Sequence, residues 1–488
     1  MSFPRPTLRG SAFVTGLLML AGTMTVTTAA TTASAAAPSA ARTVSHSVAA
    51  PALAATGRAA SARRNPYAPP RNYVPYSGSR FSYLKAGKAN GSRIRNTVLA
   101  TIQATWGGPR DRYGLPLASN GKIRIATWSF GDKGIAKALL AARNRGVSVQ
   151  VMAAADINKT HPELRWLRKR LGSAYYVRGV AGSQERRSFV RSCAGSCRGR
   201  GGTPHSKFFL FDNVGYGHAR NIVIQSSMNL TSFAWHGQWN QAEILSNAQV
   251  YAAFMAIYRE MRPATYNSSP YRIYRTGPIT NIFFPHPGSG PSTDPVMQML
   301  NQVQCTGATG AGNPGGRTKI RIIQYAIYQS RGEWIAKKLR SLWNAGCDIQ
   351  IIYAVTTRPV LSILRNHSGR GAIPMKESVI KNGQGQIVKY NHSKWVSIAG
   401  HIGSSTNAYR TMSGSANWAN LALTSDEQMQ IVEGYSNARP FMNNFVATWR
   451  QRTSGPPTLA YIAEGRVTPL PEHDIPWGKG VYKYMSED

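Results

Sequence analysis

Acidic residues are scarce in this sequence. Its 488 residues include 20 Asp and Glu against 58 Lys and Arg, a formal net charge of +38. The first 80 residues hold eight arginines and no acidic residue, so residues 81–488 still carry +30. This imbalance argues against an acidic or neutral cytosolic housekeeping enzyme. It indicates a polyanionic partner: nucleic acid, an anionic membrane surface or an anionic wall polymer.

Long apolar runs and several common catalytic motifs are also missing. Beyond the N-terminal segment, no stretch reaches the ~18 uninterrupted apolar residues that suggest a membrane-spanning helix. We find no Walker loop, no His-Glu-x-x-His and no Gly-x-Ser-x-Gly. Their absence argues against P-loop nucleotide hydrolysis, metalloprotease chemistry and an α/β-hydrolase nucleophile.

The N-terminal segment, residues 1–37, has the pattern of a secretory signal peptide. Arg5 and Arg9 precede an apolar run, Ala12–Val26, and small residues with A-x-A cleavage sites follow. The run is too short and too rich in small residues for an uncleaved membrane anchor. We therefore expect a secreted protein, with residues 38–85, rich in Ala, Ser, Pro and Arg, as a flexible linker.

Only four cysteines are present, which suits an oxidising compartment. Of the three possible pairings we favour Cys193–Cys197 and Cys305–Cys347, one in each half of the chain. The alternative is a zinc site made by Cys193, Cys197 and His205, which lacks a fourth ligand at suitable spacing.

An internal repeat organises the rest of the chain. Lys122–Ile125 recurs 197 residues later as Lys319–Ile322. Each copy predicts a strand, a helix that ends at a glycine (Gly146 or Gly346) and a second strand. Short links of this kind predict a parallel pair with a right-handed crossover. The expected strands are 123–127, 147–152, 320–325 and 348–355.

The repeat predicts an α/β fold with two similar lobes, residues 86–262 and 293–455. Residues 263–292, rich in Pro, Gly, Ser and Tyr, are the expected connector, and 456–488 the expected C-terminal tail. A ligand site between duplicated lobes is a natural expectation. The alternative is two independent lobes that share no site.

Each lobe also repeats a His-Ser-Lys sequence at the start of a predicted strand. His205 and Lys207 precede the apolar segment 208–211, and His392 and Lys394 precede 395–398. Side chains two residues apart on a strand share one face, so each His and Lys should point together.

A turn of small residues and a carboxylate follow each copy at similar distances. Ser227 lies 22 residues after His205, and Ser415 lies 23 residues after His392. The matched turn and carboxylate residues are Ser227, Asn229 and Glu243 in the first lobe, and Ser415, Asn417 and Glu427 in the second.

These residue types suit transfer of a phosphoryl group. One imidazole can attack phosphorus, and a second, protonated, can give its proton to the leaving oxygen. Lysine and asparagine side chains can neutralise the charge on the phosphoryl oxygens, so no metal is needed. A glutamate behind each histidine can fix its tautomer and stabilise the imidazolium.

The pattern His-x-Lys-(x)4-Asp with a following Gly/Ser-Ser-x-Asn, present twice over residues 86–455, resembles the phospholipase D superfamily. The resemblance implies two α/β/α lobes related by a pseudo-twofold axis, with the active site between them. It also implies a covalent phosphohistidine and hydrolysis or alcohol transfer of a phosphodiester without a metal or other cofactor. The implied catalytic residues are His205, Lys207, Asp212, Glu243, His392, Lys394 and Glu427, and the implied substrate-binding residues are Ser227, Asn229, Ser415 and Asn417.

The two copies differ at one motif position. Asp212 completes the first motif, whereas Ala399 occupies the matching position of the second. In the superfamily this Asp mainly supports local structure, so its loss need not abolish activity. We expect His205, in the complete motif, to be the nucleophile and His392 the general acid.

The leading functional hypothesis is a secreted, monomeric phospholipase D-like enzyme acting on phospholipid head groups. The main alternative is a secreted metal-independent nuclease of the same superfamily, which the +30 body favours. A non-enzymatic binder of anionic surfaces is the third. The arginine-rich segment 183–202 is either a solvated loop pinned by a disulfide or a basic lid that gathers anionic substrate. Four tryptophans are expected in the core or in a groove wall: Trp235, Trp239, Trp395 and Trp418.

Overall fold

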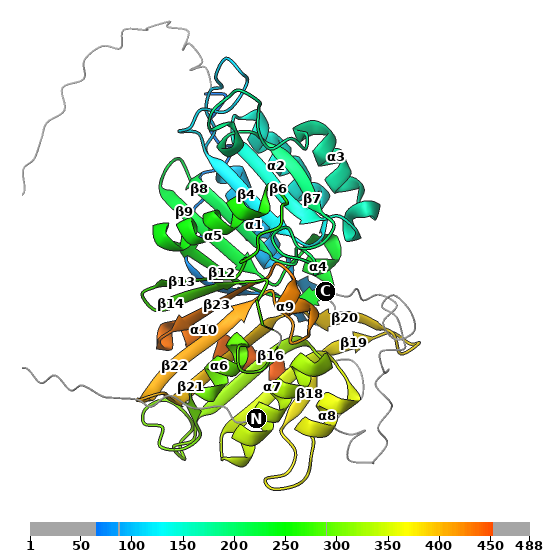
Figure 1. Cartoon of the computed structure of the whole chain (residues 1–488), viewed down its shortest axis with the longest axis vertical. Coiled ribbons are helices and arrows are strands. Elements are labelled where there is room, and N and C mark those ends of the chain that lie inside the picture. The colour runs from blue at the N-terminus through cyan, green and yellow to red at the C-terminus, as the bar shows by residue number, and fades with distance from the viewer. Residues whose placement is uncertain (1–64, 86–87, 289, 452–488) are drawn as a thin grey trace, which may run out of the picture. The chain divides into compact units, whose positions relative to one another are not determined.

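The structure is a computed structural model that describes residues 65–85, 88–288 and 290–451 (Figure 1). The predicted signal peptide and the predicted tail, 456–488, lie outside these residues. Within the described part of the chain, no helix combines the length and the apolar character needed to cross a membrane.

The first lobe is built on a mixed seven-stranded sheet. Its strands, in spatial order, are β1 (Gly78–Phe81), β12 (Gln241–Ser246), β9 (Ala219–Ser226), β8 (Phe208–Val214), β4 (Lys122–Thr127), β6 (Ser148–Ala154) and β7 (Phe189–Cys193). Its helices are α1 (Ser92–Ala104), α2 (Lys133–Asn144), α3 (Pro162–Leu171), α4 (Ser232–His236) and α5 (Ala248–Met261). The predicted pair β4–β6 is parallel, as expected, and so is β6–β7.

Strand β8 shows why helices cover both faces of this sheet. Successive side chains on a strand alternate between faces. Phe209 and Phe211 join the core formed with α1, α2 and α3, whereas Phe208 and Leu210 join the core formed with α5. All four side chains are fully buried. A continuous apolar run therefore becomes a strand that is covered on both sides.

The second lobe repeats this design. Its sheet runs β13 (Arg272–Thr276), β14 (Ile279–Phe283), β23 (Gln428–Glu433), β22 (Ser405–Gly414), β21 (Lys394–Ile402), β16 (Lys319–Ile327), β17 (Asp348–Thr356) and β18 (Met375–Glu377), with β15 (Val303–Gln304) paired to β21. Its helices are α6 (Pro295–Asn301), α7 (Gln329–Asn344), α8 (Arg358–Leu364), α9 (Leu421–Thr424) and α10 (Tyr435–Arg450). The predicted parallel pair β16–β17 is confirmed. The two-lobed α/β/α fold is therefore as the sequence predicted.

Short strands complete the body. They are β2 (Tyr83–Lys85), β3 (Lys88–Asn90), β5 (Phe130–Gly131), β10 (Leu230–Thr231), β11 (Gln238–Trp239), β19 (Val379–Lys381) and β20 (Ile387–Asn391). One of these pairs joins the lobes directly, because β11 of the first lobe runs parallel to β20 of the second.

Two segments that we predicted to be irregular carry strands. β1 lies in the predicted linker and pairs with β12, and β13–β14 forms a hairpin in the predicted connector and pairs with β23. Phe81 of β1 packs edge-on against Phe441 of α10, with ring centroids 5.2 Å apart, and Phe283 of β14 does the same with Phe254 of α5 at 4.8 Å. Each strand thus joins one lobe to a helix of the other. The hairpin β13–β14 lies near the middle of the body in Figure 1. Local composition does not reveal such strands, because distant partners stabilise them.

The favoured cysteine pairing is confirmed, with disulfides Cys193–Cys197 and Cys305–Cys347. The zinc alternative is excluded in this structure, because a disulfide sulfur is not available as a thiolate ligand.

Candidate active site

The first half of the site joins a histidine of the first lobe to a carboxylate of the second. His205 is buried just before β8, and its Nδ1 lies 2.7 Å from Oε1 of Glu427. Glu427 directly precedes β23, and a parallel bridge between Pro204 and Asp426 brings the two segments together. Ser415, from the turn after β22, donates its hydroxyl hydrogen to the other oxygen of Glu427.

The environment of Glu427 keeps it ionised. Burial by itself would raise the pKa of this carboxyl. Electrostatic interactions with His205 and Lys207, together with the hydrogen bonds from His205 and Ser415, outweigh burial and bring the pKa below its ordinary value. An ionised carboxylate at Nδ1 holds the Nδ1–H tautomer and stabilises the imidazolium.

The second half of the site has the corresponding arrangement, but the partner of its histidine is neutral. His392 Nδ1 lies 3.0 Å from Oδ1 of Asn240, which belongs to the first lobe and directly precedes β12. Ser227 donates to the same oxygen at 2.8 Å, and the Asn240 amide nitrogen donates to the Ala234 carbonyl at 2.9 Å. The amide orientation is therefore fixed, and the strand pair β11–β20 supports it from the preceding residue, Trp239.

Two glutamines bind the lysine segments across the same interface. The Gln428 side chain accepts from the Lys207 backbone N–H at 3.0 Å and donates to its carbonyl at 3.2 Å. Gln241 makes the matching bonds with the Lys394 backbone, at 3.1 and 3.3 Å. Each His-Ser-Lys segment is thus held by the other lobe, which excludes two independent lobes.

Both motif lysines are buried beside their histidines. Lys207 Nζ donates to the His205 carbonyl at 2.8 Å, and Lys394 Nζ donates to the His392 carbonyl at 3.0 Å. Their ammonium groups place positive charge next to both imidazoles, where a phosphoryl group would need it.

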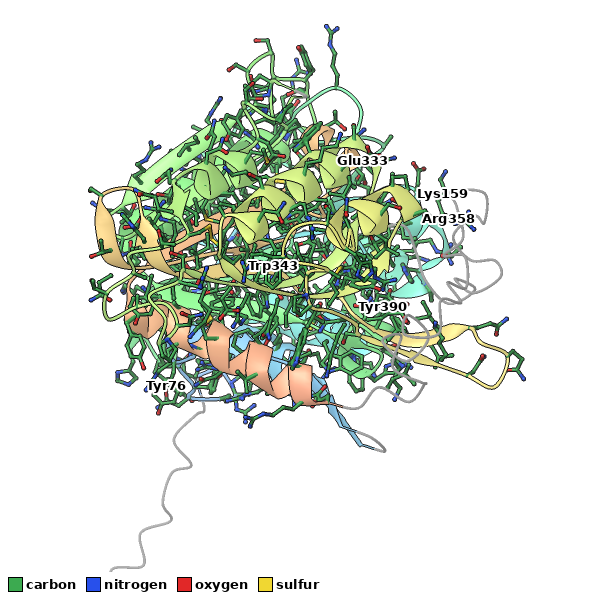
Figure 2. The ribbon with its side chains drawn as sticks, turned by 90° about the horizontal axis from the view of Figure 1, so that it is seen from below. Tyr76, Lys159, Glu333, Trp343, Arg358 and Tyr390 are labelled. Carbon is green, nitrogen blue, oxygen red and sulfur yellow. A yellow bond between two sulfur atoms is a disulfide. The ribbon has the colours of Figure 1, made fainter. Side chains whose placement is uncertain are left out.

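Aromatic side chains that we did not single out pack beside the two histidines. The Trp128 ring lies 5.8 Å from the His205 ring, and Tyr325 lies 4.8 Å from His392. Tyr390 of β20, labelled in Figure 2, stacks on Tyr325 at 5.2 Å. The repeat could have revealed the first two, because Trp128 and Tyr325 occupy the same position after the recurring Lys-Ile-Arg-Ile segment.

The expectation that Glu243 stands behind a histidine is wrong, because Asn240 occupies that place. Glu243 lies on β12, bonded to Gln225 and Ser413, and burial raises its pKa to about 8. The lobes should have been aligned through Asn240-Gln241 and Glu427-Gln428, where the shared glutamine marks the register.

Asp212 is also placed away from the histidines. It accepts from the Lys122 backbone N–H at 2.5 Å and pairs with Lys122 Nζ at 2.9 Å. It lies five positions after Lys207, about 17 Å along an extended strand. Ala399 takes the corresponding position opposite Lys319. The motif aspartate therefore ties β8 to the start of β4 and is not part of the reacting centre.

The predicted substrate-binding residues divide into two kinds. Ser227 and Ser415 donate to the partners of the histidines, so they orient those partners. Asn229 and Asn417 lie buried in the same turns, and contact between them and substrate stays a prediction.

Two arginines of the segment 183–202 make internal ion pairs, whereas Arg200 of the same segment is exposed. Arg198 is fully buried and bonds Glu260 at 2.8 Å, and Arg186 pairs with Asp111 at 2.6 Å. These guanidinium groups serve internal contacts. Trp239, Trp395 and Trp418 are buried, as expected for core residues.

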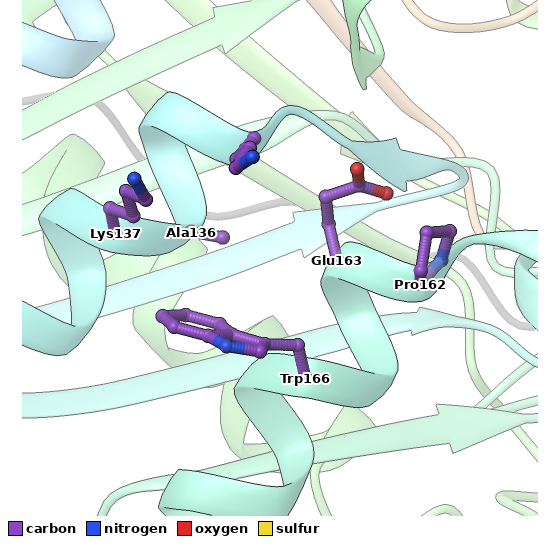
Figure 3. A pocket seen from close by; sticks show the side chains of 6 residues that line it. Ala136, Lys137, Pro162, Glu163 and Trp166 are labelled. Atoms are coloured by element: carbon purple, nitrogen blue, oxygen red, sulfur yellow. The ribbon is translucent and has the colours of Figure 1, made fainter.

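A separate hollow of about 290 Å³ opens between α2 and α3 (Figure 3). Trp166 of α3 reaches toward Ala136 and Lys137 of α2. None of the predicted site residues lines it. Within the described residues, His, Cys, Asp and Glu side chains nowhere gather in threes as metal ligands would.

Comparisons with known proteins give one family match. Residues 117–262 match the family described as "Cardiolipin synthase, PLD-like domain". No curated protein matches the sequence.

Several solved structures are similar in part. Polyphosphate kinase from Porphyromonas gingivalis shares 13% identity, with a TM-score of 0.48 over 80% of this chain and 56% of its own. Phosphatidylserine synthase from Haemophilus influenzae shares 13% identity, with a TM-score of 0.46 over 76% of this chain and 86% of its own. Nuc, a phospholipase D family member from Salmonella typhimurium, shares 19% identity, with a TM-score of 0.27 over 41% of this chain and all of its own.

Proposed function

We propose that this chain is a member of the phospholipase D superfamily, which the match of residues 117–262 supports, and that it hydrolyses phospholipid head groups through a phosphohistidine. The observation that carries the proposal is the pair of buried histidines, each oriented at Nδ1 by the opposite lobe, one by a carboxylate and one by an amide. With Nδ1 engaged, Nε2 of each ring is the nitrogen that reacts.

In the first step, His205 Nε2 attacks phosphorus and the bond to the head-group oxygen breaks. His392 donates its Nε2 proton to that oxygen, so the head group leaves as a neutral alcohol. The ionised Glu427 stabilises the positive imidazole ring of the phosphohistidine, because it accepts the Nδ1–H. This is why the carboxylate-paired histidine is assigned as nucleophile.

In the second step, water attacks the phosphohistidine and the P–N bond breaks. His392, now neutral, takes the proton from the water, and phosphatidate leaves. Lys207 and Lys394 neutralise the phosphoryl oxygens in both steps, with Asn229 and Asn417 as hydrogen-bond donors. The chemistry of these side chains requires no cofactor.

The N-terminal segment and the two disulfides support export, so the substrate is proposed to be an extracellular lipid. A monomer is sufficient, because both histidines and both of their partners come from one chain.

The second candidate is a metal-independent nuclease, favoured by the +30 charge of residues 81–488. Lysine and arginine contacts with phosphates dominate the affinity of proteins for nucleic acid. The buried site chemistry would serve either phosphodiester.

A paired assay in EDTA tests both candidates. One reaction contains phosphatidylcholine and phosphatidylglycerol vesicles, the other plasmid DNA, and His205→Ala is the blank for each. Head-group release without nicking is the expected result. Nicking without head-group release would make the protein a nuclease. Loss of activity in EDTA would contradict the cofactor-free mechanism, and binding to both polyanions with no turnover would favour the non-enzymatic binder.

A further inference from the structure

The two halves of the site differ in the backbone contacts between the lobes that support them. At His392, the backbones of the lobes pair as strands β11 and β20, and β19 extends that small sheet. At His205, the corresponding contact is a single bridge, Pro204 to Asp426. The carboxylate half of the site therefore has less regular backbone support than the amide half.

A loop closed by a disulfide lies beside the single bridge between Pro204 and Asp426. β7 ends at Cys193, and the bond to Cys197 closes a short loop directly after it. The Cys197 backbone N–H donates to the buried carboxylate of Asp426, the residue before Glu427. Arg198, fully buried, fixes the far side of the loop through Glu260 and the Phe284 carbonyl.

The residues that follow the loop contact the same turn of the second lobe through hydrogen bonds and close backbone packing. Asp426 N–H donates to the Thr203 carbonyl at 2.9 Å, and Thr203 N–H donates to Ser425 Oγ at 3.1 Å. The Ser206 hydroxyl donates to the Asp426 carbonyl at 3.1 Å. At Gly202, with φ +59°, a Cβ would lie 2.3 Å from the Thr424 carbonyl oxygen, so the backbones touch. These contacts set the position of the residue that follows Asp426.

We propose that the Cys193–Cys197 disulfide loop and Asp426 are positioning elements for Glu427, and that this disulfide must form for full activity. The loop acts through Asp426 on Glu427, and Glu427 acts on His205 Nδ1. The inference rests on the proposed function for its kinetic test. A displacement of about 1 Å at such a site can cost up to a hundredfold in rate.

The chain supplies a matched control in its second disulfide. Cys305–Cys347 closes the longer loop, with a sequence separation of 42 against 4, and joins the residue after β15 to the residue before β17. Its removal should lower Tm more than removal of Cys193–Cys197, since the longer loop restricts the unfolded chain more. It should leave kcat within about twofold, because it does not touch the turn that carries Glu427.

The experiment compares C193S/C197S with C305S/C347S on phospholipid vesicles. For C193S/C197S we expect kcat to fall roughly 10- to 100-fold with KM little changed, and the acidic limb of the pH–rate profile to move to lower pH as His205 loses its carboxylate partner. Asp426→Ala should reproduce this loss, and Asp426→Asn, which keeps an acceptor for Cys197 N–H, should recover most of it. In an E427Q background, removing the disulfide should cost little more.

Unchanged kcat and an unchanged pH profile in C193S/C197S would overturn the proposal, as would an equal loss in the control. Amide hydrogen exchange of residues 424–428 provides a test that needs no turnover. Faster exchange there in C193S/C197S, and not in C305S/C347S, supports the proposal even if the wild-type protein cleaves no phospholipid, a result that would count only against the proposed function. Equal exchange in all three proteins would overturn the positioning role.

Discussion

At the scale of single residues, the two histidines differ in their partners. Glu427 is a carboxylate whose pKa lies below its ordinary value, because the charges and hydrogen bonds around it outweigh its burial. Asn240 is a neutral amide in the corresponding place. The pseudo-twofold axis therefore relates two imidazoles that are chemically inequivalent, which suits one nucleophile and one acid.

This inequivalence predicts opposite effects of two substitutions. Glu427→Gln should lower kcat by roughly 10²- to 10³-fold, since the charge that stabilises the phosphohistidine ring is lost. Asn240→Asp should raise the pKa of His392 and move the basic limb of the pH–rate profile to higher pH, because a carboxylate favours the imidazolium. Full pH–rate profiles of both variants check this. The same limb moving in both variants would contradict the assigned roles.

Glu243 predicts a pH dependence of stability. Burial raises its pKa to about 8 in the folded protein, well above the ordinary value of an unfolded glutamate. The unfolded state then holds fewer protons between about pH 4.5 and 8, so this residue makes stability fall as pH rises through that window. Glu243→Gln should remove this contribution and raise Tm near pH 8 relative to wild type, while leaving Tm near pH 4 similar. Thermal unfolding at both values measures it; a Tm difference that does not grow with pH would refute the assignment.

At the scale of elements, each histidine lies just before a strand of one lobe, and its partner lies just before a strand of the other lobe. His205 comes just before β8, and Glu427 comes just before β23 of the other lobe. Asp212, further along β8, holds that strand to the start of β4 through Lys122. Asp212 therefore contributes to the stability of strand β8 and not to the reaction.

Asp212→Ala should therefore reduce stability and spare catalysis. The partly exposed ion pair and the bond to the Lys122 N–H together suggest a loss of about 1–2 kcal/mol in the free energy of unfolding. Per folded molecule, kcat should stay within about twofold. Urea unfolding and the vesicle assay measure the two quantities, and a large fall in kcat at full folding would return Asp212 to the catalytic set.

At the scale of the whole molecule, the surplus of positive charge predicts adsorption to anionic bilayers. The inactive His205→Ala protein should bind phosphatidylglycerol vesicles more tightly than phosphatidylcholine vesicles. Binding should weaken as the salt concentration rises from about 0.05 to 0.5 M. Over this range the Debye length falls from roughly 14 to 4 Å, so salt screens the attraction more strongly. Sedimentation of vesicles with the protein checks this. Equal binding to both lipids at low salt would show that the net charge does not direct adsorption.

Features that depend on residues close together in the chain were predictable from the sequence, whereas features that depend on distant residues were not. The repeat predicted four strands and two helices, and the disulfide pairing was also right. β1 and the β13–β14 hairpin were missed, because their composition resembles a linker and their pairing partners lie far along the chain. Asn240 was missed for a similar reason, since an amide attracts no notice until a histidine is placed against it.

The sequence by itself determined the duplicated α/β design and the His-Ser-Lys chemistry, because periodicity, strand propensity and motif spacing are local properties of the chain. Only the tertiary structure decided which residue orients each histidine. That choice depends on two backbone contacts between lobes, β11 with β20 and Pro204 with Asp426. Such contacts join residues 152 and 222 positions apart, and packing of the complete lobes, rather than any local pattern, determines them.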